Sequence, residues 1–199
     1  KTGNNSAIVL DAGSQPDPID RCLTKLHISY VPILVLTHFH ADHVGGIQGV
    51  FRHRTIGHVW VTALYEPAMT TEFALRCLQQ KNLKPEVIGQ LRHEVIGDVD
   101  IQVVWPARII TGQGSDPNNS SIAVIASVHG RSLFLSGDLE PAAQSAILDS
   151  WPVPRVDVLK VAHHGSSHQF PALIERLHPR DAVISVGKDN DYGHPAPET

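Results

Sequence analysis

The chain has 199 residues, of which 42% are hydrophobic and 18% are charged, as in an ordinary globular protein and unlike a disordered segment. Its formal net charge of −4 speaks against a protein that wraps nucleic acid with a broad basic face, although bound divalent ions can reverse the charge of a local site. No apolar run approaches the roughly 20 residues that a membrane-spanning helix needs, so we expect this piece to be soluble.

The predicted elements alternate between short strands and helices. Apolar, β-branched runs bounded by Gly, Pro, Asp and Asn predict strands at residues 7–10, 33–36, 58–61, 101–105, 122–128, 133–135, 156–161 and 182–186. Helices are predicted at residues 45–51, 67–80, 141–148 and 171–177, and a polar loop at residues 112–120. This alternation favours two sheets packed together with helices outside, a four-layer α/β arrangement.

The start of the chain carries no initiator methionine and no signal peptide. We therefore expect residues 1–199 to form a single domain taken from a longer protein. Histidine is the most unusual component, with 13 in the chain. Those in short stretches rich in Gly, Asp and Ser are His38, His40, His43, His163, His164, His168 and His194.

The second predicted strand runs into the most informative segment, residues 37–43, which reads Thr-His-Phe-His-Ala-Asp-His. His38 and His40 are two apart in extended backbone, so their side chains project from the same side and can bind one ion. Asp42 and His43 follow where the chain curls and can turn towards a second ion nearby. Neutral imidazoles with a carboxylate suit zinc, and also manganese or iron.

Other strand ends carry similar side chains. Asp138 follows a predicted strand, where its two oxygens can bridge two cations. Because adjacent side chains diverge, we expect only one of His163 and His164 to bind an ion, while the other contacts substrate or supports a ligand. Asp11 ends the first strand, where it either holds a ligand histidine in the right tautomer or forms an ordinary turn.

Taken in order, these segments resemble the metallo-β-lactamase superfamily over nearly the whole chain. The segments are Asp11-Ala12-Gly13, the His-x-His-x-Asp-His run and Gly137-Asp138. The resemblance implies an αββα sandwich with two divalent metal ions at the edge between the sheets. The ligands that it implies are His38 and His40 for one ion, Asp42 and His43 for the other, and Asp138 as the bridge.

A narrower resemblance is to the C-terminal hydrolase domain of ComEC-type DNA-internalization proteins, membrane channels that import single-stranded DNA during natural transformation. It rests on residues 37–43, 118–121, 160–166 and 184–195, the last of which includes Tyr-Gly-His-Pro. This resemblance implies a parent membrane channel outside the chain. It also implies a soluble domain outside the cytoplasm, facing incoming DNA and degrading the strand left there.

The chain departs from the superfamily in one place, because the usual histidine between the first cluster and Asp138 is missing. Residues 116–121 occupy its position. We expect the His38/His40 ion to take an oxygen ligand from Asp116, Asn118 or Asn119, or to be held more weakly. An oxygen-richer site shifts the metal preference towards manganese.

The last histidine ligand is open among His163, His164 and His194. We favour His163 for a metal and His194 for metal or phosphate contact. Asp42 is expected to orient the nucleophile as well as bind metal, and His164 or His194 to stabilise the transition state or protonate the leaving group. Ser166, Lys188 and His194 are the candidate substrate contacts.

The leading hypothesis is a metal-dependent phosphodiesterase or nuclease that cleaves DNA, with two divalent ions, Zn or Mn, and no organic cofactor. One alternative keeps the site and changes the substrate to a thioester, lactone or β-lactam. Another is a non-catalytic domain that guides DNA to a channel. The aromatic share of only 6% speaks against that alternative, since strong single-strand binding relies on stacking.

Overall fold

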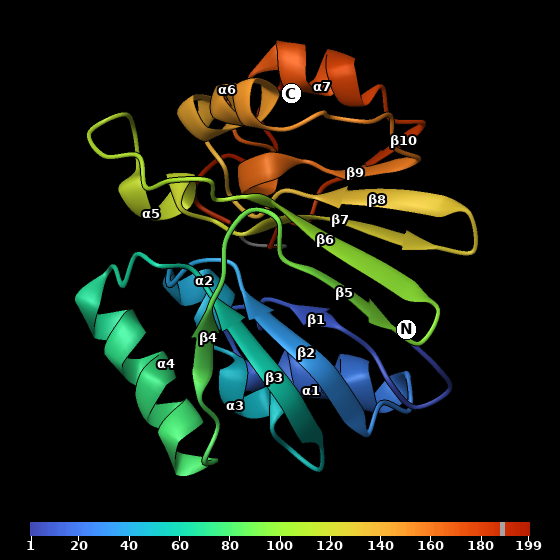
Figure 1. Ribbon diagram of the computed structural model, residues 1–199. Helices are drawn as coiled ribbons and strands as arrows, with labels where there is room; N and C mark the ends of the chain where they lie inside the picture. The colour runs from blue at the N-terminus through green and yellow to red at the C-terminus, as the bar shows by residue number, and fades with distance from the viewer. Residues whose placement is uncertain (188–189) are drawn as a thin grey trace. The chain divides into compact units, whose positions relative to one another are not determined.

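The computed structural model describes residues 1–187 and 190–199 (Figure 1). The chain divides into two compact units, the first made of Lys1–Ile88 and Val95–Val99, the second of Gly89–Glu94 and Asp100–Thr199. Each unit contains a β-sheet with helices packed on it, so the chain is mixed α/β with two sheets, as predicted. None of the described helices combines the length and apolar character needed to cross a membrane.

The first unit contains a four-stranded, all-parallel sheet in the order β1-β2-β3-β4. Its strands are β1 (Val9–Leu10), β2 (Tyr30–Leu36), β3 (Thr55–Val61) and β4 (Pro85–Val87). Leu10 pairs with Val35 across the first two strands. Because parallel neighbours end at the same edge of a sheet, the residues that follow β1 and β2 come together there.

Helices cover one face of this sheet. They are α1 (Pro16–Lys25), α2 (Ala41–Val44), α3 (Ile47–Val50) and α4 (Ala68–Gln80). Apolar side chains of α1, α3 and α4 share one buried cluster with those of β2 and β3. The prediction for residues 67–80 is confirmed as α4, whereas residues 45–51 hold only the short α3, preceded by α2. The sequence did not predict α1, because Pro16 and Pro18 look like loop residues, yet proline is tolerated in the first turn.

The second unit contains a six-stranded sheet in the order β10-β9-β8-β7-β6-β5, except for the part of β5 and β6 within Val95–Val99, which belongs to the first unit. Its strands are β5 (His93–Ile96), β6 (Val99–Trp105), β7 (Ala123–Val128), β8 (Arg131–Leu135), β9 (Val158–Lys160) and β10 (Asp181–Val183). β7 and β8 are antiparallel, while β8, β9 and β10 run parallel, so β8 and β9 end at the same edge. The sequence missed β4 and β5, which are short and rich in Pro and charged residues that are depleted in strands.

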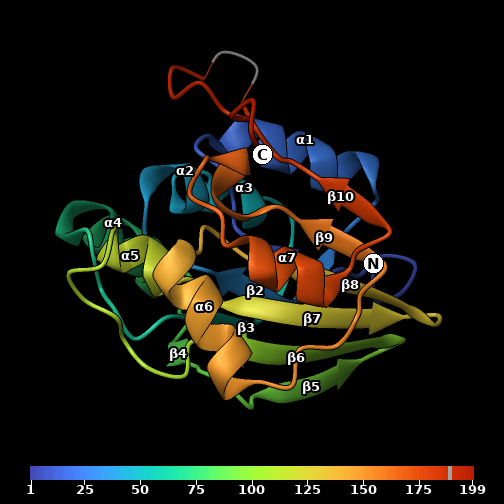
Figure 2. The same cartoon turned by 90° about the horizontal axis from the view of Figure 1, so that it is seen from above.

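The helices of the second unit are α5 (Asp116–Asn119), α6 (Pro141–Ser150) and α7 (Pro171–Leu177), with a 3₁₀ turn at Ala162–Gly165. Apolar side chains of α6 and α7 form one buried cluster with the sheet, and both helices lie over it in Figure 2. The segment predicted as a polar loop, residues 112–120, holds the single-turn helix α5. It is also buried at its end, since Asn119 and Ser120 are both 0% exposed.

A buried arginine links the start of β3 to α1 and α3. The Arg54 side chain, 2% exposed, donates to the Asp20 carboxylate at 2.8 Å and to the carbonyl oxygens of Ile28 and Gly49, both at 3.1 Å. The hydrogen bond from Arg54 holds the pKa of Asp20 below its ordinary value. Arg52 also contacts Asp20, but its side chain is 43% exposed.

We predict that Arg54→Met lowers the free energy of unfolding by more than Arg52→Met does, since the acceptors around the Arg54 side chain lose their donor. Arg52→Met, the matched control, should change it little, because exposed ion pairs contribute little. The stabilisation through Asp20 exists above the carboxyl's unfolded pKa of about 3.9 and is lost as the pH falls through the lower folded value. In urea denaturation, the difference in free energy of unfolding between the wild type and Arg54→Met should therefore become smaller below about pH 4. Equal stability of the two variants would contradict the assignment.

Candidate metal centre

Asp11, directly after β1, is the hub of the ligand cluster in the first unit. Its Oδ1 accepts from the Thr37 amide at 2.8 Å. Its Oδ2 accepts from the Thr37 hydroxyl at 2.9 Å and from His43 Nδ1 at 2.8 Å. The parallel register of β1 and β2 brings Asp11 and Thr37 side by side. Of the two sequence-based interpretations of Asp11, this arrangement favours the one in which the carboxylate holds a histidine.

These contacts fix the tautomers of two histidines. A carboxylate oxygen only accepts, so His43 carries its proton on Nδ1 and its Nε2 bears the lone pair. The Thr37 hydroxyl gives its proton to Asp11 and therefore accepts from His38 Nδ1 at 3.2 Å. The His38 lone pair is likewise on Nε2. Metal-binding histidines commonly receive this support from a carboxylate or a hydroxyl.

The donor set of the first unit fits a divalent metal. His38 Nε2 lies 3.0 Å from His40 Nδ1, and two nitrogens bound to one tetrahedral zinc ion lie about 3.3 Å apart. The rings of His38 and His43 have centroids 4.1 Å apart, and His43 Nε2 is 3.7 Å from an Asp42 oxygen. His38 and His43 are buried, whereas the Asp42 side chain is 54% exposed. The structure thus brings together all four ligands predicted in this segment.

Two glycines allow the chain to pass close to the loop that carries Asp11. A Cβ at Gly46 would collide with the carbonyl oxygen of Ala12, and one at Gly45 would lie 2.5 Å from that of Ser14. The amide of Ala12 also donates to the carbonyl oxygen of His43 at 2.7 Å. Any larger side chain here would push α2, and His43 with it, away from Asp11.

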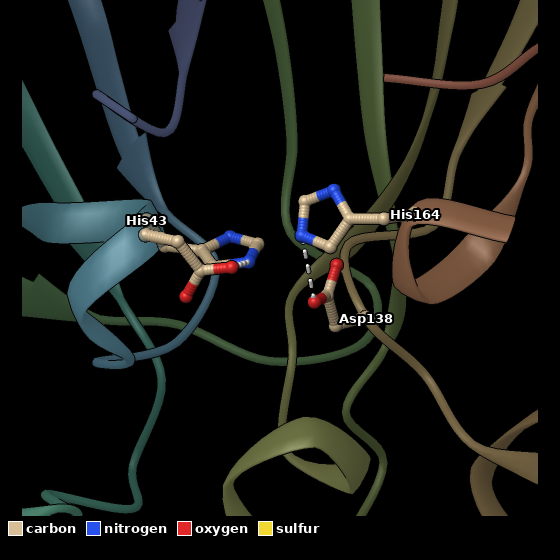
Figure 3. Close-up of side chains that lie close together, drawn as sticks. His43, Asp138 and His164 are labelled. Atoms are coloured by element: carbon tan, nitrogen blue, oxygen red, sulfur yellow. Dashed lines mark ion pairs between the residues drawn. The ribbon is translucent and has the colours of Figure 1, made fainter. Parts of the chain in front are cut away.

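The second unit holds a separate pair, Asp138 and His164 (Figure 3). His164 Nδ1 lies 2.6 Å from the carbonyl oxygen of Ser185, which can only accept, so Nδ1 carries the proton. In the neutral imidazole the Nε2 lone pair then faces Asp138 Oδ2 at 3.2 Å. Two acceptors at this distance require a cation, either a proton or a metal ion. The pair therefore also fits a divalent metal.

Asp138 is held in place by neighbouring strand ends. It is 2% exposed, and its amide donates to the hydroxyl of Ser121 at 3.2 Å. Lys160 at the end of β9 donates to the carbonyl oxygen of Gly137 at 2.8 Å and approaches Asp138 Oδ1 at 3.4 Å. The carboxylate thus has a lysine on one oxygen and His164 on the other.

The adjacent His163 and His164 point to different partners. Both adopt left-handed backbone, with φ of 48° and 53°, which is rare for residues other than glycine and often marks a functional turn. Their ring centroids are 6.4 Å apart. His163 faces Glu140 at 3.7 Å instead of Asp138, and burial lowers the pKa of its imidazole. The metal role predicted for His163 stays a prediction.

The remaining predicted substrate contacts are scattered. The ring centroid of His194 lies 5.6 Å from that of His163. The side-chain amide of Asn190 donates to the carbonyl oxygen of His194 and accepts from its backbone amide, both at 3.0 Å. Ser166 is 1% exposed, and its hydroxyl accepts from the amide of His168. Lys188 lies outside the described residues.

All three proposed substitute ligands make hydrogen bonds within the second unit. The Asn119 amide oxygen accepts from Ala143 in the first turn of α6, and its nitrogen donates to Gln113 at 2.7 Å. Asn118 donates to Glu140 at 3.0 Å. Asp116 accepts from the amide of Gly112 at 2.7 Å. Their roles as ligands stay predictions, and Asn119 in particular ties its loop to α6.

Sequence reasoning missed three residues that support the ligands, namely Thr37, Lys160 and Glu140. Thr37 lies between the end of β2 and His38, and Lys160 ends β9 shortly before His163, and these positions could have marked them. Glu140 is harder to recognise from the sequence, because a glutamate directly before a helix that begins with proline is typical of an ordinary helix N-terminus.

The chain matches the family model of the metallo-beta-lactamase superfamily over residues 2–188. It therefore belongs to this superfamily and is a metal-dependent hydrolase of it, and the His/Asp ligand sets of its units suit divalent metals. The predicted fold class is confirmed at the same time, because the two sheets with their helices match solved metallo-β-lactamase structures.

Among curated proteins, the chain is similar to ComE operon protein 3 of Bacillus subtilis (strain 168), with 30% identity over 177 residues. This match covers 87% of the chain but 22% of that protein, so the chain spans about a fifth of the length of the curated relatives it matches. It agrees with the predicted resemblance to ComEC-type proteins.

Two solved structures illustrate the shared fold. Zn(2+)-bound PqqB from Methylobacterium extorquens gives a TM-score of 0.55 at 10% identity, covering 81% of this chain and 57% of its own. CmlA, a diiron beta-hydroxylase from Streptomyces venezuelae, gives a TM-score of 0.51 at 16% identity, and the match covers 84% of this chain and 40% of CmlA. At these identities the likeness shows the fold alone.

We predict that Asp11→Asn weakens metal binding by about 10- to 100-fold, since the support of ligand histidines has this effect elsewhere. An amide has one accepting oxygen in place of two, so Thr37 and His43 cannot both keep their partners. Asparagine tolerates the left-handed backbone of Asp11, whose φ is 59°, so the fold should survive. Competition with a zinc chelator measures the affinity. Asp17→Asn, at a side chain 64% exposed, is the control, and equal affinities in both variants would refute the role of Asp11.

Proposed function

We propose that this domain is a metal-dependent phosphodiesterase that cleaves DNA. The observation that carries the proposal is the ligand chemistry at the strand ends, with the tautomers of His38, His43 and His164 all set to present Nε2. Similarity to a competence operon protein supports DNA as the substrate. A thioester, lactone or β-lactam substrate is the rival within the same superfamily.

In this proposal the domain binds two divalent ions. The proposed ligands are His38, His40, Asp42, His43, Asp138 and His164. We prefer His164 to the sequence-based choice, His163, because its Nε2 faces Asp138 at 3.2 Å while His163 faces Glu140. The histidine nitrogens in this set favour zinc. Because Asp42 and Asp138 add carboxylate oxygens, manganese is the alternative metal.

When bound, such ions lower the pKa of an attacking water and offset charge on the non-bridging phosphate oxygens. Side chains of the domain would orient the attacking water and keep the ligands in position. Asp42, exposed enough to meet solvent, would orient the water and accept its proton. Asp11 would hold His43 in one tautomer throughout, so that its ring stays oriented.

The C-terminal segment would contact the phosphodiester. We propose that His194, held by Asn190 and stacked near Tyr192 with ring centroids 6.1 Å apart, donates to a phosphate oxygen or to the leaving group. Lys188 is a further candidate for phosphate contact, from outside the described residues.

We further propose that the chain is one domain of a longer membrane protein that imports DNA, and that it faces incoming DNA outside the cytoplasm. The similarity to ComE operon protein 3, of which the chain spans 22%, supports this placement. The alternative, a domain that guides DNA without cutting it, predicts DNA binding that survives metal removal.

We predict that the metal-loaded protein degrades DNA, and that Asp42→Ala and His43→Ala each lower the rate by at least about 10²-fold, the scale of a lost proton-transfer group. Chelation of the metal should abolish cleavage, and manganese, zinc or magnesium added in parallel identifies the ion that restores it. His53→Asn is the matched control, since His53 is exposed and its φ of 56° suits asparagine.

Full activity in both the Asp42 and the His43 variants would contradict the proposed site. A second assay separates the substrate classes. Faster hydrolysis of bis-p-nitrophenyl phosphate than of a panel of thioesters, lactones and β-lactams supports the phosphodiesterase, and the reverse order supports its rival.

A further inference from the structure

A second group of possible metal ligands lies within the second unit, beside His164 but not including it. Ligand atoms of Glu140, His163 and His168 all lie within 4.8 Å of one another. Two histidines and a glutamate are the ligand set of catalytic zinc sites that keep one coordination position open. The group is assembled from the start of α6 and from the loop that follows β9.

Glu140 is a buried carboxylate that pairs with no lysine or arginine among the residues that the structure describes. It is 8% exposed, and its two oxygens accept from the amide of Ser115 at 2.9 Å and from Asn118 Nδ2 at 3.0 Å. Across the part of the chain that the structure describes, His163 is the ionisable side chain that pairs with it. A charge removed from water with two neutral donors is costly unless a cation accompanies it.

The surroundings of Glu140 are shaped to hold its carboxylate. Gly114 has a φ of 90°, and a Cβ at that position would collide with Glu140 Oε2. Asn118, 3% exposed, donates its amide nitrogen to Glu140, while its amide oxygen is buried and makes no hydrogen bond within the described residues. This oxygen, on a side chain that contacts Glu140, could serve as a further metal ligand.

His163 presents a second unsatisfied atom to the same place. Its Nδ1 is buried, makes no hydrogen bond within residues 1–187 and 190–199, and lies 3.7 Å from Glu140 Oε1. The left-handed backbone of the turn directs this ring away from that of His164. His163 is therefore positioned to serve Glu140, and His164 to serve Asp138.

His168 completes the group from a loop that buried side chains hold in place. Gln144, 2% exposed, donates to the carbonyl oxygen of His168 at 3.3 Å and accepts from the amide of Phe170 at 2.8 Å. The hydroxyl of Ser166 accepts from the amide of His168 at 3.3 Å. The backbone is thus fixed while the exposed His168 side chain can rotate towards the other two ligands.

An open pocket gives access to the group. It has a volume of about 670 Å³, and its lining includes Glu140, His168, Phe170 and the segment from Gln113 to Ser115. An ion bound by Glu140, His163 and His168 could exchange with solvent through it and keep a water in its open position. The ligand atoms would need to draw in from at most 4.8 Å to about 3.3 Å, within the reach of side-chain rotation.

We propose that Glu140, His163 and His168 form a zinc-type metal site distinct from the ligand sets of the proposed phosphodiesterase centre. The site is mononuclear, with two imidazoles, one carboxylate and an open position facing the pocket. It accounts for the buried charge of Glu140 and for the opposite directions of the two adjacent histidines.

The test is the number of zinc ions bound at equilibrium. Metal-free protein is dialysed against a fixed free concentration of zinc, and bound metal is measured by mass spectrometry. We expect the wild type to bind one equivalent more than His168→Ala. His178→Asn is the matched control, because His178 is exposed, lies outside both groups and has a φ of 43° that asparagine tolerates. Equal zinc content in the wild type and His168→Ala would overturn the proposal.

A second comparison separates this site from the phosphodiesterase centre. In a protein that already carries Asp42→Ala and His43→Ala, adding His168→Ala should still remove one further equivalent, since the two proposed sites share no ligand. No further loss in that background would also refute the separate site. DNA cleavage by His168→Ala should stay at the wild-type level. If neither the wild type nor any variant cleaves DNA, the proposed function is contradicted. The separate zinc site is still tested by the measured zinc content.

Discussion

The Asp11 carboxylate is the interaction on which the ligand cluster of the first unit depends. It accepts three hydrogen bonds at 2.8–2.9 Å, two from Thr37 and one from His43, and through the Thr37 hydroxyl it also reaches His38. The parallel pairing of β1 and β2 makes this possible, because both strands end at the same edge. The loop after Asp11 then packs against Gly45 and Gly46, so the same few residues fix the ligand tautomers and the position of α2.

The second unit uses the same principle with different partners. The carbonyl oxygen of Ser185 sets the tautomer of His164, and Lys160 holds the turn that carries Asp138. Left-handed backbone at His163 and His164 costs roughly 1–2 kcal/mol per residue, and persists only where the surrounding contacts impose it. Such strain at a strand end is typical of a site whose side-chain directions matter more than local stability.

The direction of these two side chains also shapes what the chain can bind. One histidine faces the carboxylate of Asp138, the other that of Glu140, although they are neighbours in sequence. Each carboxylate has a different electrostatic environment, since Asp138 has Lys160 beside it, whereas Glu140 accepts from two neutral donors and pairs with His163. If the proposed site is correct, the second unit offers two chemically different places for a cation.

The sequence by itself determined the superfamily and the fold class, and it predicted the candidate ligands between His38 and His43 from one contiguous segment. Within six residues that follow a buried strand, the sequence places four candidate ligands, so that part of the site can be recognised without knowing the fold. Only the tertiary structure decided that His164 meets Asp138, that Glu140 and His168 join His163, and that both ends of the Asn119 amide are engaged. The pairs His164–Asp138 and His163–Glu140 join residues far apart in sequence, and left-handed backbone reverses directions that an extended strand would predict. Helix α1 was likewise decided by tertiary packing, since its prolines resemble a loop until Leu23 is buried against the sheet.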